Sequence, residues 1–88
     1  MRDFVIVTVS DTKKSFDYDM ELPTGEESQS LAGDIAQVLK AYDPTRVKLS
    51  PPYQLFCKRL GRELADGETL AEAGVWSGDR LVINGTYR

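Results

Sequence analysis

The sequence contains no histidine and only one cysteine, Cys57. Histidine is the commonest metal ligand and the commonest general base near neutral pH, so its absence removes the usual starting points for metal-dependent and hydrolytic catalysis. A single cysteine rules out a disulfide within the chain, which suits a reducing compartment. We therefore expect a cytoplasmic protein without a cofactor, and the sequence assigns no catalytic, cofactor-binding or metal-ligating residue.

Long apolar runs and a surplus of positive charge are also missing. No apolar run approaches the roughly 20 residues that span a bilayer, and the first residues lack the features of a signal peptide. The chain has 11 Lys and Arg residues against 14 Asp and Glu residues, which leaves a net charge of −3. Nucleic acids and anionic membranes attract basic proteins, so we expect no nucleic-acid partner and no direct membrane insertion.

What is present suits one small globular domain. A chain of 88 residues buries roughly 60–65% of the surface of its unfolded state, which is enough for a single hydrophobic core. No repeat, low-complexity stretch or linker divides the sequence. We predict one domain over residues 1–88, with a folded core over 4–83 and a short tail over 84–88.

The beginning of the chain predicts a β-hairpin. Residues 4–9 form an apolar, β-branched run that is typical of a strand. Residues 16–22 alternate between apolar and acidic side chains, which is the pattern of a half-buried strand. The apolar side chains are Phe16, Tyr18, Met20 and Leu22, and the acidic ones are Asp17, Asp19 and Glu21.

A helix follows the hairpin. Thr24 with Glu27 resembles a capping box at its start, although Ser28 is an alternative first cap. Apolar side chains at spacings of three and four then predict one buried stripe, and Pro44 ends the helix. The members of the stripe are Leu31, Ile35, Val38, Leu39 and Tyr42. Strands are then predicted over 53–58, briefly at Leu64 and over 80–84, with a helical turn over 70–73.

This order of elements is that of the β-grasp fold, an α+β architecture in which a mixed four- to five-stranded sheet packs on one α-helix. The segment 64–70, LADGETL, is similar to the corresponding part of ubiquitin. The segment 73–83, AGVWSGDRLVI, resembles the closing motif of the YukD/EsaB family, and VIVTV at 5–9 is similar to its first strand. Members of that family are small ubiquitin-like proteins linked to bacterial type VII secretion.

The resemblance implies a non-catalytic, cytosolic module that binds a protein partner, namely a component of the secretion machinery. Two alternatives remain open. A covalent ubiquitin-like modifier needs a flexible end that finishes in Gly-Gly, whereas residues 84–88 are NGTYR. A ubiquitin-like domain cut from a larger secretion or membrane protein is the other; Met1 argues weakly against a cut at the front, and nothing excludes one at the back. A homodimer is also possible.

Three groups of side chains have both a functional and a structural interpretation. Cys57 lacks a neighbouring base and shares strand parity with Leu55, which favours a buried apolar role over a nucleophile. The acidic side chains of 16–22 lie about 6.6 Å apart along the strand, which favours a solvated edge over a cation site and leaves docking of a lysine-rich partner as the remaining option. The third group is basic, and we favour a scattered set of solvated side chains over a surface that steers an acidic partner. Its members are Arg46, Lys48, Lys58, Arg59 and Arg62.

Strand parity predicts a working surface. If Val5, Val7 and Val9 face the helix, their neighbours must face the other side of the sheet. The predicted protein-binding face, which the acidic side chains would rim, consists of Phe4, Ile6, Phe56, Lys58 and Val82. This face corresponds to the best-known binding surface of ubiquitin. Trp76 either seals one end of the core or serves as an exposed anchor.

The same parity, together with the helical stripe, predicts the core. Its members should line a single interior between the helix and the sheet. They are Val5, Val7, Val9, Tyr18, Met20, Leu22, Leu31, Ile35, Leu39, Leu55, Cys57, Leu64, Leu70, Val75, Leu81 and Ile83.

Overall fold

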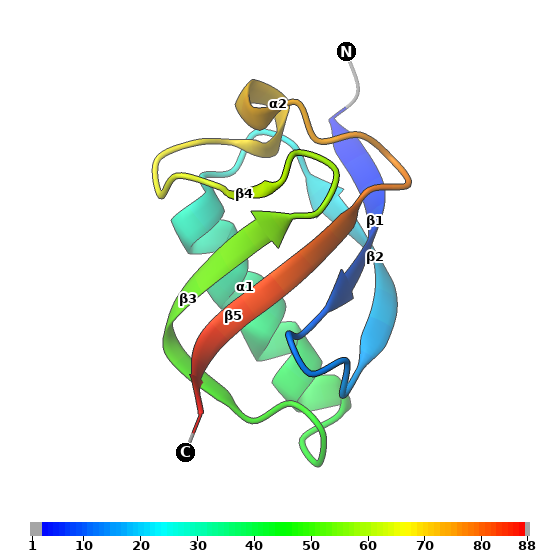
Figure 1. Ribbon diagram of the computed structural model, residues 1–88, viewed down its shortest axis with the longest axis vertical. Helices are drawn as coiled ribbons and strands as arrows, with labels where there is room; N and C mark the ends of the chain where they lie inside the picture. The colour runs from blue at the N-terminus through cyan, green and yellow to red at the C-terminus, as the bar shows by residue number, and fades with distance from the viewer. Residues whose placement is uncertain (1–2, 88) are drawn as a thin grey trace.

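A computed structural model, which describes residues 3–87, shows a 5-stranded sheet with one long helix packed across one of its faces (Figure 1). The strand order is β2-β1-β5-β3-β4. Strand β5 is parallel to β1, and the other neighbouring pairs are antiparallel. The predicted β-grasp α+β fold with a mixed sheet is therefore confirmed. The elements are β1 (Phe4–Ser10), β2 (Asp17–Pro23), α1 (Ser28–Tyr42), β3 (Leu49–Cys57), β4 (Arg62–Glu63), α2 (Leu70–Ala73) and β5 (Arg80–Tyr87).

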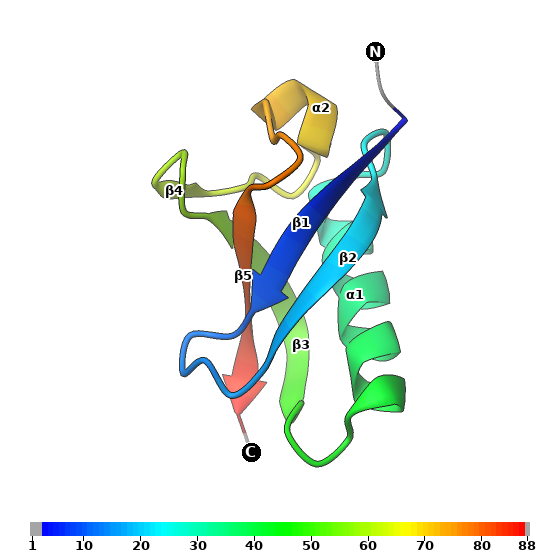
Figure 2. The ribbon, with the colours of Figure 1, turned by 90° about the vertical axis from the view of Figure 1, so that its right-hand side faces the viewer.

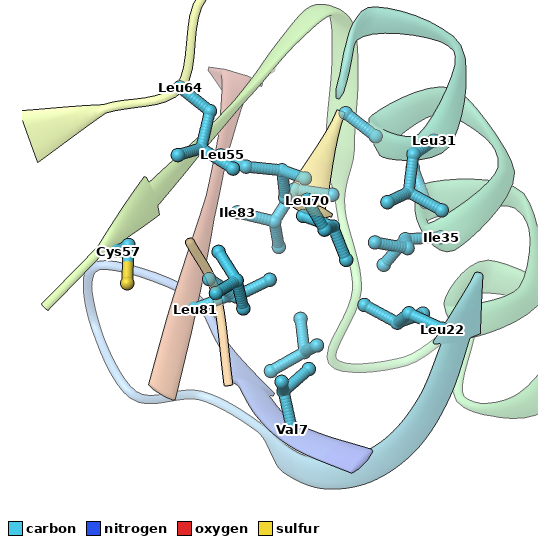
Figure 3. Close-up of a cluster of buried hydrophobic side chains, with 14 of the residues drawn as sticks. Val7, Leu22, Leu31, Ile35, Leu55, Cys57, Leu64, Leu70, Leu81 and Ile83 are labelled. Carbon is cyan, nitrogen blue, oxygen red and sulfur yellow. The ribbon is translucent and has the colours of Figure 1, made fainter. Parts of the chain in front are cut away.

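The core lies between α1 and the sheet. Figure 3 shows side chains from the strands and both helices converging there, with Leu70 of α2 among them. Every predicted core residue is buried except Tyr18 and Met20, which are half-buried and pack against the cluster. Further buried apolar side chains come from the hairpin, the helices, the segment before β3 and the first residue of β3, and they are Phe16, Ala32, Ala36, Val47, Leu49 and Ala73.

The predicted apolar stripe of the helix was wrong at two positions. Val38 is 55% exposed and Tyr42 is 73% exposed. The sheet contacts a neighbouring stripe of α1 instead, in which the small side chains Ala32 and Ala36 allow the helix to approach closely. The predicted stripe was based on large apolar residues, whereas the side of α1 that packs on the sheet includes alanines.

The capping box lies on the other helix. Helix α1 begins after Glu27, which makes no side-chain capping bond, and the Ser28 N–H donates to the carbonyl of Glu68 (2.8 Å). Helix α2 has the complete box, because the Thr69 side chain accepts from the Glu72 N–H while the Glu72 carboxylate accepts from the Thr69 N–H. The predicted box of Thr24 and Glu27 was therefore wrong.

The last strand is longer than predicted. Strand β5 continues to Tyr87, with residues 86 and 87 opposite Ser50 and Leu49 of β3. The prediction of a short tail over 84–88 was wrong for 84–87, and Arg88 lies outside the described residues. The sheet register shifts between Ser50 and Gln54, at the two prolines, which have no N–H to donate; pairing then resumes on their far side.

Candidate protein-binding surface

The face of the sheet opposite α1 is open, and β1 presents alternate side chains to it. Val5, Val7 and Val9 are buried against the helix, whereas Phe4 is 52% and Ile6 is 55% exposed. The predicted parity of β1 is therefore confirmed. Phe4 and Ile6 are apolar side chains that folding leaves in water.

Val82 is on the open face but is not exposed. It pairs with Phe56 of β3 on one side and with Ser10 of β1 on the other. Its exposed fraction is only 7%, so the prediction that it forms part of an exposed patch was wrong. The loop between β1 and β2 projects on the side of the sheet away from α1 (Figure 2), and its Asp11, Thr12 and Lys14 line the same hollow as Val82.

The same loop borders a small hollow of about 310 Å³ beside Val82. Phe56 and Lys58 line the hollow from β3 and the residue that follows it, and Asp11 and Lys14 line it from the loop. Phe56 is half-buried and Lys58 is exposed. Phe56, Lys58 and Val82, three of the predicted face residues, therefore lie together around a hollow rather than on a flat surface.

A polar row separates this hollow from Phe4 and Ile6. In the ladder, Asp19 is opposite Thr8, and Thr8 is opposite Arg80. The Thr8 hydroxyl donates to the Asp19 carboxylate (Oγ1–Oδ1 2.7 Å), and Arg80 Nη1 donates to Asp17 Oδ2 at 3.0 Å. The prediction of one continuous apolar patch was wrong, although the parity that Arg80 shares with Val82 could have revealed the interruption.

Trp76 lies in the loop between α2 and β5, at the same end of the sheet as Phe4 and Ile6. Two hydrogen bonds hold this loop against β1: the Ile6 N–H donates to the Ser77 side-chain Oγ (3.2 Å), and the Gly78 N–H donates to the Ile6 carbonyl (2.8 Å). Trp76 is 64% exposed, so it does not seal the core. An open hollow of about 500 Å³ adjoins it, lined in part by Val5 and Val75.

Arg59 holds the Trp76 loop in place. Its guanidinium carbon lies 4.1 Å from the centre of the Trp76 ring, which is a cation–π contact. The same guanidinium binds Asp79 through two hydrogen bonds and also donates to the Gly74 carbonyl. We name Phe4, Ile6, Trp76 and Arg59 the Trp76 patch.

Asp79 is a buried anion that fixes the turn before β5. It accepts from the Trp76 N–H (N–Oδ2 2.8 Å) as well as from Arg59. The Arg59 guanidinium beside Asp79 holds the pKa of that carboxyl below its ordinary value, and Asp79 in turn raises the pKa of Arg59. The sequence predicted a turn at Asp79 but did not assign it a partner, because Arg59 is 20 residues away.

The remaining basic residues behave mainly as separate surface groups. Arg62 forms a two-point pair with Glu68, which lowers the pKa of that carboxyl, and Arg46 lies 3.7 Å from Asp43. Lys48 is exposed. The basic residues do not form one surface, because Arg46, Arg59 and Arg62 each have an acidic partner in a different part of the molecule.

Cys57 is fully buried, as predicted. Its sulfur lies 4.0 Å from Asp79 Oδ2, inside the structure rather than at the surface. Residues 3–87 contain no group of three or more Cys, Asp or Glu side chains that could hold a metal ion. No helix within that range is long and apolar enough to cross a membrane.

Comparison with known proteins agrees with this description. The family model described as "WXG100 protein secretion system (Wss), protein YukD" matches residues 4–83. The chain belongs to the YukD family. YukD proteins are named for a WXG100, or type VII, secretion system, so the chain is a ubiquitin-like module of type VII secretion. A comparison with curated proteins gives no match.

Solved structures extend the likeness of this YukD domain to ubiquitin-like folds. The ubiquitin-like domain of EccD5 from Mycobacterium xenopi is similar at a TM-score of 0.75 and 16% identity, over 99% of each chain. Ubiquitin from Caldiarchaeum subterraneum is similar at a TM-score of 0.72 and 21% identity, over 97% of this chain and 96% of that one. Identities this low show the shared fold alone.

A third structure is described as "MycP5-free ESX-5 inner membrane complex, State II". One of its chains is similar at a TM-score of 0.80 and 17% identity, over 99% of this YukD chain. The match spans only 22% of that chain. The YukD domain therefore corresponds to about a fifth of a larger protein, and the activity of that whole protein does not follow from the match.

Proposed function

We propose that this YukD domain is a non-catalytic, cytoplasmic protein-binding module that docks on another component of a type VII secretion system through the Trp76 patch. The observation that carries the proposal is that Ile6 and Trp76, both more than half exposed, lie in segments joined by hydrogen bonds, with the exposed Phe4 on the same face of β1 as Ile6. Exposed apolar groups that gather with a polar rim mark interaction surfaces more often than scattered ones do. Trp and Arg are also the residue types that contribute most to protein interfaces.

The Trp76 patch is organised before any partner binds. The Arg59 guanidinium contacts both the Asp79 carboxylate and the Trp76 ring, and the Trp76 N–H donates to the same carboxylate. A side chain that is already held in place loses little conformational entropy on binding, which favours affinity. The predicted face residues Phe56, Lys58 and Val82 lie beyond the polar row and are assigned no contact in this proposal.

The likeness to a chain of the ESX-5 inner membrane complex and to the EccD5 domain supports a partner within the secretion assembly. The partner would present an apolar pocket for Trp76 and an acidic or carbonyl group for the exposed side of Arg59.

Capture of secretion components tests this function. A tagged chain would be purified from its native bacterium, and the captured proteins would be identified by mass spectrometry. Trp76→Ala should weaken binding of the captured component by about 2 kcal/mol or more, which is roughly a 30-fold higher Kd. Gln37→Ala, at an exposed position of α1, is the control and should bind like the parent. Full binding by a correctly folded Trp76→Ala variant would contradict the proposal.

A further inference from the structure

Strand β2 is an edge of the sheet, and its outer backbone groups are unpaired by any strand of residues 3–87. The direction of these groups follows from β1. The Thr8 N–H donates to the Asp79 carbonyl (3.1 Å) and the Ile6 carbonyl accepts from Gly78, so the even residues of β1 bond toward β5. The odd residues of β1 must then bond toward β2.

The register of the β1–β2 ladder shows which residues of β2 bond to β1. Val7 is opposite Met20 and Val9 is opposite Tyr18, so Tyr18 and Met20 direct their backbone groups inward to β1. Asp19 and Glu21 lie between and beyond them, and their N–H and C=O groups therefore point away from the sheet. An edge of this kind is a template for one more strand.

An apolar groove runs beside this edge, between β2 and α1. One part, of about 370 Å³, is lined by Tyr18, Met20, Val38 and Tyr42, and a second part, of about 180 Å³, continues along Met20 and Val38. Figure 2 shows β2 and α1 running side by side on the face turned to the viewer. Val38 and Tyr42 are the apolar helix positions that the core does not use.

The groove walls are fixed. The Tyr18 and Tyr42 rings meet edge to face, with their centres 5.3 Å apart. The Tyr18 hydroxyl donates to Asp43 Oδ2 at 2.7 Å. The groove is therefore present before a ligand binds.

Acidic side chains surround the groove and select its occupant. Asp19 and Glu21 project from β2 toward the open face, beside the groove-facing side chains of the strand. Glu26 and Asp34 line the far end, where the neighbouring Asp34 raises the pKa of the Glu26 carboxyl. A second copy of this chain would place Asp19 and Glu21 opposite like charges in the new ladder, which is unfavourable.

We propose that β2 and the β2–α1 groove bind an extended segment of a partner protein in which apolar and basic residues alternate. The segment adds a strand beside β2, using the outward backbone groups of Asp19 and Glu21. Its apolar side chains enter the groove against Met20 and Val38, and its basic side chains lie on the opposite side, facing the acids. Pro23 lacks an N–H, so the added strand ends there. The added strand lies beyond β2 and does not use Trp76 or Arg59, although Glu21 is opposite Ile6 of the Trp76 patch in the ladder.

A synthetic peptide tests the proposal. The probe is a capped hexapeptide, Lys-Val-Lys-Ile-Lys-Val, and the control has the same residues in two blocks, Lys-Lys-Lys-Val-Ile-Val. At saturating probe, amide hydrogen exchange measured by NMR should slow at least 10-fold at Asp19 and Glu21, while exchange at Met20, already bonded to β1, changes little. The block peptide should bind at least 10-fold more weakly.

Variants locate the site. Val38→Arg and Glu21→Lys should each raise the Kd of the probe at least 10-fold with an unchanged Tm. Ala65→Arg is the control, since Ala65 is exposed in the turn after β4, at the edge of the sheet opposite β2, and it should bind the probe like the parent.

Three results would overturn the proposal. Equal affinity for the two peptides, without protection at Asp19 and Glu21, would mean unspecific attraction of positive charge. Protection of these amides without peptide, together with dimers in sedimentation, would make a second copy the occupant. An absence of binding at millimolar probe would mean that the edge does not accept a strand of this kind.

Discussion

Arg59 and Asp79 form a two-point ion pair that ties the turn after β3 to the turn before β5, with Nε–Oδ1 at 2.8 Å and Nη2–Oδ2 at 3.0 Å. Asp79 is buried, whereas Arg59 is partly exposed and covers the Trp76 ring. The Asp79 carboxylate thus links the start of β5, through Arg59, to the exposed ring of Trp76. The planar guanidinium suits this geometry, and a lysine ammonium does not.

Replacing the carboxylate should loosen the Trp76 loop. Asp79→Ala leaves the Trp76 N–H and the Arg59 fork without an acceptor, and the lost hydrogen bonding should lower the free energy of unfolding by about 1–3 kcal/mol. Trp76 fluorescence should also change, because the ring loses its fixed cation. Arg59→Lys should show the fluorescence change as well, since it keeps the charge but not the fork. An unaltered emission spectrum in both variants would contradict this account of the loop.

Stability should fall in acid through Asp79. Its folded-state pKa is below that of the unfolded chain, so its contribution is complete above the unfolded value of about 3.9 and is lost as pH falls through the folded value. Glu68, whose pKa is lowered by Arg62, should act in the same direction. Urea unfolding measured from about pH 6 down to about pH 2 would give the profile. Asp79→Asn should flatten it, and a profile that stays as steep would assign the acid sensitivity to other groups.

The two apolar faces of α1 should differ sharply in stability tests. Ile35 is 1% exposed, and Ile35→Ala should cost about 2–5 kcal/mol because it opens a cavity in the core. Val38→Ala, on the exposed face of the same helix, should stay within about 0.5 kcal/mol of the parent. Chemical denaturation measures both. Equal losses would mean that Val38 packs in the core, as the sequence pattern alone had suggested.

Gly85 and Gly33 should respond oppositely to alanine. A Cβ at Gly85 would lie 2.8 Å from the Ser50 carbonyl oxygen and 3.2 Å from Leu49 Cβ, so the β3–β5 pairing would have to shift, at a cost of about 1–3 kcal/mol. Gly33 lies within α1 with open space around it, and Gly33→Ala should stabilise by roughly 1 kcal/mol. Thermal melts of the two variants should therefore move in opposite directions. A neutral Gly85→Ala would show that residues 84–87 do not pair with β3.

Local patterns were enough to predict the fold of this protein. The alternation over 16–22, the valines of β1 and the helical spacing of Leu31, Ile35 and Leu39 each depend on the repeat of one element, and each placed its side chains on the correct side. The LADGETL and AGVWSGDRLVI segments carried the family resemblance because they encode short turns and spaced core residues. These features are properties of neighbouring residues, so no knowledge of distant contacts was needed.

The shape of the surface was decided only in the tertiary structure. Parity placed Val82 on the open face, but its side chain is buried beside the β1–β2 loop, and Arg80 lies between Val82 and Ile6. The fixed position of Trp76 comes from Arg59, and the extension of β5 comes from pairing with Leu49 and Ser50. Each of these outcomes depends on groups that are distant in sequence and meet only when the strands pair. For that reason the residue pattern determined the layers of this domain, whereas the contacts between elements determined the surface that it presents to a partner.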